Sequence, residues 1–192
     1  LLSILAESLD LTITDLLCAL FPSLAGTAGT SGVNLSVDNW FDAIYYLNLK
    51  NNVGEGLVSV LHAQQVNDLI ASIRGEAGAM QYKADAQGML GPKGVGFVGE
   101  FAGVKIVQSD SVSSDGSDRR GAMFAPGCFV YTLGPVDVGV QVNPADIVVA
   151  TPEMFVERNR DAANAMTSYV VNAYPAVAEQ EDLRGIKIVT DA

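Results

Sequence analysis

The stretch LVSVLHAQQVNDLIASI, residues 57–73, decides the fold class of this chain. Residues 57–61 are apolar and β-rich, a pattern that predicts a short buried strand. Apolar residues then recur at helical spacing, and they predict a helix with an inner face of Val66, Leu69, Ile70 and Ile73. Gly75 ends this helix. A buried strand followed by an amphipathic helix predicts a domain of mixed helices and strands in which helices pack on a sheet.

The chain upstream of this stretch predicts a second amphipathic helix. Ser36 offers an N-cap, and the helix is expected to run to about Lys50. Its apolar face is predicted to hold Val37, Trp40, Phe41, Ile44 and Leu47. Residues 23–35 before it are small and polar, which predicts a loop.

The first segment, Leu1–Phe21, predicts a further helix that ends before Pro22. It is apolar enough to suggest a membrane span, but Glu7, Asp10 and Asp15 interrupt it. Each such carboxylate costs about 2.5–3.5 kcal/mol at the centre of a spanning helix. We therefore expect a packed helix and no contact with a membrane.

The chain downstream is expected to be mainly β. Its glycine density predicts a long, partly mobile loop from about Gly75 to Gly96. A strand is predicted over Phe97–Gln108, followed by an exposed polar loop over 110–120. Valines alternate with other residues over 136–142 and predict a half-buried strand. Further strands are predicted at about 153–160, 166–173 and 186–190.

Composition narrows the classes of function. The chain has 192 residues, of which 49% are hydrophobic and only 17% charged, and its formal net charge is −11. This composition excludes a disordered chain. The negative charge repels nucleic acid phosphates and anionic membranes, so neither is an expected partner.

The sequence predicts no catalytic, cofactor-binding or metal-binding site, and the chain is not expected to be an enzyme. Gly94, Gly96 and Gly99 spell G-x-G-x-x-G, but a strand follows where a dinucleotide site needs a helix. Asp110, Asp115 and Asp118 do not have the spacing of an EF-hand, and Arg119-Arg120 is expected on a solvated loop.

The two cysteines and the single histidine have structural interpretations. Cys18 and Cys128 lie in apolar runs and are expected to be buried thiols in a reducing compartment. His62 lies where a strand gives way to a helix, which predicts a turn or capping role. A thiol hydrolase that uses Cys128 and His62 stays a remote alternative.

The order of the motifs resembles tailed-bacteriophage major capsid proteins. LVSVLHAQQVNDLIASI is similar to the strand, turn and helix element of that family. FVGEFAGVKIVQSD, residues 97–110, is similar to its strand after the central loop, and SYVVNAYPAVAEQEDLRGIKIVTDA resembles its closing strands. The chain looks like the C-terminal part of such a protein.

The resemblance implies an α+β fold, that of the phage major capsid proteins, with the following domain organisation. Residues 1–30 would form the end of a spine helix in the peripheral domain. Residues 31–150 would form the axial domain, with helices on a central mixed sheet. Residues 151–192 would return to the peripheral domain as strands and end in a C-terminal strand.

The resemblance also implies a function. A major capsid protein is a structural subunit that self-assembles into an icosahedral shell around the viral genome. Its partners would be other copies of itself in hexamers and pentamers, with portal, scaffold or decoration proteins as further candidates. It would act in the virion capsid after assembly in the host cytoplasm, without a cofactor. The alternative is an encapsulin-like nanocompartment shell, which shares the fold.

The family carries an N-terminal arm and an extended loop before the spine helix. Leu1 starts a helical pattern without a preceding N-cap. We therefore expect the native subunit to be longer than this chain by on the order of 100 residues, the size of a small domain.

Overall fold

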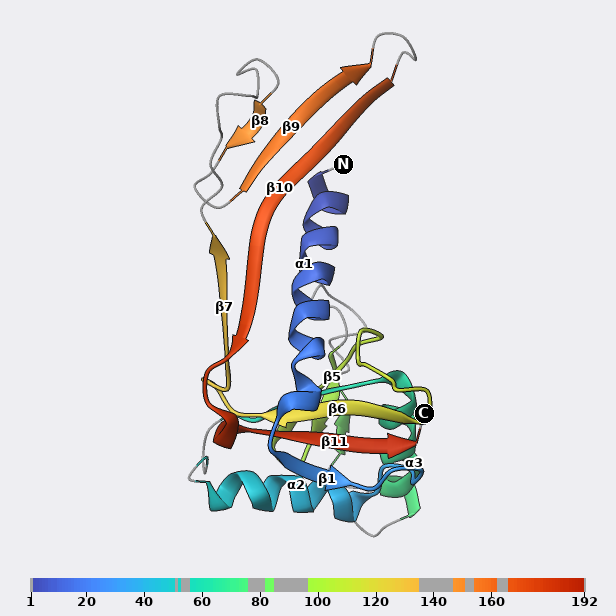
Figure 1. Ribbon diagram of the computed structural model, residues 1–192. Helices are drawn as coiled ribbons and strands as arrows, with labels where there is room; N and C mark the ends of the chain where they lie inside the picture. The colour runs from blue at the N-terminus through green and yellow to red at the C-terminus, as the bar shows by residue number, and fades with distance from the viewer. Residues whose placement is uncertain are drawn as a thin grey trace. The chain divides into compact units, whose positions relative to one another are not determined.

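The structure is a computed structural model, which describes residues 2–50, 52, 56–75, 82–84, 97–134, 147–150, 154–161 and 166–191. Two compact units divide the chain: Leu1–Ile13 with Tyr131–Val177, and Thr14–Val130 with Ala178–Ala192. The strands described form one seven-stranded and one four-stranded sheet (Figure 1). The predicted combination of helices with a mixed sheet is confirmed.

The seven-stranded sheet forms the second unit. Its strands, in spatial order, are β1 (Gly26–Gly29), β11 (Gly185–Asp191), β6 (Asp118–Phe124), β2 (Val58–Leu61), β5 (Val104–Gln108), β4 (Phe97–Phe101) and β3 (Tyr82–Ala84). The β1–β11 and β2–β5 pairs are parallel, and the other pairs are antiparallel. At its centre, β6 therefore lies between β2 and β11, which are both distant from it in sequence.

Each face of this sheet has its own apolar core. On one face, helices α2 (Val37–Leu49) and α3 (Ala63–Gly75) cover the sheet through Trp40, Leu47, Leu69, Ile106 and Ile188. On the other face, the end of α1 (Leu2–Ala19) and the short helix η1 (Phe21–Ser23) pack with Cys18, Phe21, Leu24, Val60, Ala122 and Cys128. Adjacent residues such as Val60 and Leu61 enter different cores because side chains alternate along a strand.

Several predicted elements are confirmed, namely α2, β2, α3 and β11. The Ser36 hydroxyl accepts a hydrogen bond from the Asn39 amide at 3.2 Å, as its N-cap role requires. Trp40, Ala43 and Leu47 are the buried residues of α2, whereas Phe41, predicted to be on the inner face, is exposed. The apolar stripe is therefore centred on Ala43, and Phe41 lies at its edge.

The expectation of a loop over 23–35 is wrong in part, because this segment contains β1 and the last residue of η1. In the β1 sequence, GTAG, only Thr27 favours a strand, and parallel pairing with β11 holds the segment in place. Gly26 is needed there, since a Cβ would lie 2.7 Å from the Tyr46 ring. Gly29 has a φ of +84° and passes close to the Val189 carbonyl, so it too favours glycine.

Two other boundaries also differ from expectation. The single strand predicted over Phe97–Gln108 is an antiparallel hairpin of β4 and β5. Ala102 and Gly103 both have positive φ values, 52° and 81°, which suit a tight two-residue hairpin turn. The polar loop predicted over 110–120 ends earlier, because β6 already begins at Asp118 and pairs with β11.

The four-stranded sheet has the order β7 (Phe129–Gly134), β10 (Met166–Glu179), β9 (Met154–Asp161) and β8 (Ile147–Ala150). The predicted strand near 153–160 is confirmed as β9. The next strand is longer than predicted and ends at Glu179 instead of near Ala173. The β9 partners of β10 end at Ala173, so Pro175 removes no hydrogen bond from the β9–β10 pair.

The predicted strand at 136–142 and most of the predicted loop at 75–96 lie outside the described residues. The short strand β3 falls within that loop region. The expected domain boundaries after residues 30 and 150 stay predictions, while the two units divide at residues 13, 130 and 177. No helix among the described residues has the length and apolarity to cross a membrane.

Candidate functional site

His62 caps helix α3. Its Nδ1 accepts a hydrogen bond from the Gln64 amide at 3.2 Å, and its own amide donates to Gln65 Oε1 at 3.1 Å. Burial is the main cause that lowers the pKa of the imidazole, and the nearby positive charge of Arg119 lowers it further. The Asp110 carboxylate acts in the opposite direction and raises this pKa. The predicted capping role is confirmed, and the neutral ring is the form that can accept at Nδ1.

Cys18 and Cys128 are free thiols buried in the same apolar core. Burial is the main cause that raises the pKa of Cys18 to about 11 and that of Cys128 to about 12. Neutral thiols of this kind are weak nucleophiles. The predicted burial is confirmed, and it disfavours the hydrolase alternative.

We expect both thiols to react slowly with iodoacetamide at pH 7.5 in the folded protein. Burial blocks access to the sulfur, and the raised pKa values keep the thiolate fraction very low. Intact-mass spectrometry over time should show labelling only after denaturant is added. Rapid single labelling of the folded protein, removed by Cys128→Ser, would instead favour a reactive cysteine.

The three aspartates of the Ser-rich segment do not form a common site. The Asp115 carboxylate accepts from the amides of Asp118 and Ser117, which lower its pKa, and forms an ion pair with Arg120. The Asp118 carboxylate points elsewhere and accepts from Ser31 Oγ at 2.9 Å. The described residues include no group of three or more potential metal-binding His, Cys, Asp or Glu side chains.

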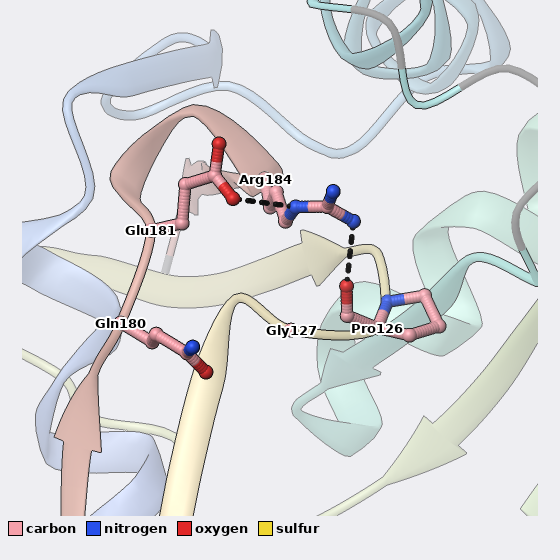
Figure 2. Close-up of a pocket in the computed structure, with 5 residues that line it drawn as sticks. All are labelled: Pro126, Gly127, Gln180, Glu181 and Arg184. Atoms are coloured by element: carbon pink, nitrogen blue, oxygen red, sulfur yellow. Dashed lines mark hydrogen bonds and ion pairs between the residues drawn. The ribbon is translucent and has the colours of Figure 1, made fainter.

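An open pocket of about 540 Å³ lies where the β6–β7 turn meets the β10–β11 connection. Its lining residues are Pro126, Gly127, Gln180, Glu181 and Arg184 (Figure 2). The Arg184 guanidinium donates to Glu181 Oε2 at 2.7 Å and to the Pro126 carbonyl at 2.9 Å. Arg184 therefore fastens two connections together, and the geometry indicates a structural role.

The folded protein disfavours the charged form of Asp68 on α3. Its Oδ2 is buried without a hydrogen-bond partner, and burial, reinforced by the Asp191 carboxylate, raises its pKa. The folded state therefore binds this proton more tightly than the unfolded state, in which the pKa lies near 3.8. Stability falls as the pH rises through the interval between the two pKa values.

We expect Asp68→Asn to raise the melting temperature at pH 7, because it removes a charge that the folded state disfavours. Well below the unfolded pKa, at about pH 3, Asp68 is protonated in both states and the gain should vanish. Thermal unfolding followed by circular dichroism at both pH values tests this. An equal gain at both pH values would show that the charge of Asp68 is not the cause.

The structure also leaves apolar side chains exposed, which the sequence motifs did not indicate. On α2, Phe41, Tyr45 and Leu49 recur at every fourth residue and share one outer face. On β10, Met166, Val170 and Tyr174 are exposed along one strand. Exposed apolar side chains that share one face of an element suggest a place for contacts with another protein.

Neither the protein-family models nor the curated proteins include a match to this chain. Among solved structures, a chain from Mycobacterium phage Che8 is similar over 97% of this chain, with a TM-score of 0.55 and 20% identity. A chain of the holo-SrpI encapsulin complex from Synechococcus elongatus PCC 7942 is similar over 86%, with a TM-score of 0.50 and 14% identity. This chain spans 59% and 52% of their respective lengths. At these identities the likeness shows the fold alone, and it is consistent with the capsid-type fold that the motifs predicted.

Proposed function

We propose that this chain is a shell-forming structural protein, the major capsid protein of a tailed bacteriophage. One observation carries the proposal: 97% of the chain follows the fold of a phage chain. The exposed apolar surfaces on α2 and β10 support it, because a shell subunit buries such surfaces against its neighbours.

The charge of the chain supports the same role. At a net charge of −11, the inner wall of a shell would not adhere to the DNA that it encloses. We propose a non-enzymatic role, and the two buried thiols support it because neutral thiols are weak nucleophiles. We place the protein in the virion capsid, as hexamers and pentamers of itself. Portal, scaffold or decoration proteins are further proposed partners.

An encapsulin-like nanocompartment is the second candidate function, because an encapsulin chain shares the fold. The two candidates differ in what the shell contains. A capsid holds viral DNA, whereas a nanocompartment holds a cargo protein.

Purification of native particles, followed by electron microscopy, tests the proposal. We expect closed icosahedral particles in which this chain belongs to the main protein, with nuclease-resistant DNA inside. Closed particles that contain an enzyme and no DNA would favour the nanocompartment. A protein that remains monomeric under all conditions would contradict both candidates.

A further inference from the structure

Asp115 and Gly116 form the only Asp-Gly pair in the sequence, and they lie in an exposed turn that leads into β6. The Asp115 amide donates to the Asp118 carbonyl at 3.2 Å and closes the turn. Gly116 has a φ of +93°, and no heavy atom lies within 4 Å of the position that a Cβ would take there. Gly116 therefore brings no side chain that would shield the peptide bond after Asp115.

An Asp-Gly pair can react with itself. The Gly116 nitrogen attacks Cγ of the protonated Asp115 carboxyl group, a C–N bond forms, and the carboxyl hydroxyl leaves with the N–H proton as water. The product is a five-membered succinimide, which water then opens. Attack of water at Cγ restores aspartate, whereas attack at the main-chain carbonyl carbon gives isoaspartate, in which the backbone runs through the side-chain carboxyl group. The two steps release one water molecule and take up another, so they need no oxidant or cofactor.

The folded turn restrains both reacting groups. The Gly116 amide donates to Ser114 Oγ at 3.1 Å. Asp115 Oδ1 accepts from two backbone amides further along the turn, at 3.1 and 2.9 Å, and Oδ2 forms an ion pair with Arg120. These contacts stabilise the ionised carboxylate, whereas the reaction needs the protonated group. They also hold the carboxyl group in place, so it must leave its partners before Cγ can meet the Gly116 nitrogen.

We propose that Asp115 is a site of spontaneous isoaspartate formation, at a rate that Arg120 limits. Arg120 lies on β6, and its ion pair with Asp115 is partly exposed, with side-chain exposed fractions of 36% and 38%. Exposed ion pairs are weak, so the protection is partial and the reaction is slow but measurable. The product has one more carbon atom in the main chain, directly before β6. This inference does not depend on the proposed shell function.

The test incubates the folded protein at neutral pH and follows isoaspartate by electron-transfer mass spectrometry of the tryptic peptide 106–119. Trypsin releases this peptide from native protein and variants alike, because it cleaves after Lys105 and Arg119. We expect isoaspartate to accumulate at residue 115. Arg120→Gln should raise the rate about two- to fivefold, the range that an exposed ion pair supports. Arg120→Lys retains the cation and should stay close to the native rate.

Arg74→Gln is the matched control, because it removes an exposed arginine from the end of α3. It should leave the rate at residue 115 unchanged, and circular dichroism verifies that each variant is folded. In urea, which removes the hydrogen bonds of the turn, the native chain should isomerise faster than in buffer. Absence of isoaspartate at residue 115 in the unfolded chain overturns the site. Equal rates for the native protein and Arg120→Gln, or an equal increase in Arg74→Gln, overturn the protective role of Arg120.

Discussion

Replacing Trp40 with alanine should lower the free energy of unfolding by about 3–5 kcal/mol, the usual cost of deleting a buried tryptophan. Trp40 is fully buried on α2, with its ring centroid 6.2 Å from that of Phe101 on β4. Trp40 packs α2 against the seven-stranded sheet, so its loss leaves a cavity between this helix and the sheet. Since the free energy of unfolding of a domain is about 5–15 kcal/mol, the substitution would remove a large share of it.

Guanidinium unfolding followed by far-UV circular dichroism measures this loss, because Trp40 is the single tryptophan and fluorescence disappears with it. Tyr45→Ala is the matched control on the same helix, since Tyr45 is 64% exposed and should change stability by only about 0.5 kcal/mol. Trp40→Phe should cost less than Trp40→Ala. It retains an aromatic ring and removes an indole N–H that is buried without a partner. Equal midpoints for Trp40→Ala and Tyr45→Ala would contradict this role of Trp40.

The sequence was informative wherever one residue pattern determined one element. The helices around Trp40 and Leu69 followed from helical spacing, and β2 followed from its short apolar run. Strand β1 could not be predicted, because GTAG forms a strand only where β11 offers backbone partners and Tyr46 requires a glycine. The β4–β5 turn was also missed, since Ala102 adopts a positive φ that its residue type rarely takes.

The candidate interface was less predictable than the fold. In β10 both alternating sets of residues are nearly free of charge, as Tyr169 and Val170 illustrate, so the sequence does not separate an inner from an outer face. The structure leaves both sets exposed over residues 166–170, Tyr169 and Val170 included. The roles of His62 and the cysteines could be predicted, because a capping residue and buried thiols depend mainly on local sequence context.

Replacing Gln65 with glutamate should destabilise the second unit strongly, and more at pH 7 than at pH 4. Gln65 is fully buried, and its Nε2 donates to Thr190 Oγ1 at 2.9 Å and to the carbonyls of Ile188 and Arg119 at 3.3 Å. A carboxylate oxygen in that place would face two carbonyl oxygens without a proton to share. Each buried polar group left unpaired costs about 1–3 kcal/mol, and a charge costs more.

The pH dependence follows from the same burial. A buried carboxyl has a raised pKa, so the folded variant would bind a proton more tightly than the unfolded chain. Its stability deficit should therefore grow as the pH rises through that interval, and unfolding midpoints at the two pH values measure it. Gln64→Glu is the matched control, because only the backbone amide of Gln64 is used in capping and its side chain is not buried. If both variants lost the same stability, the Gln65 amide would not be the link that holds α3 to β6 and β11.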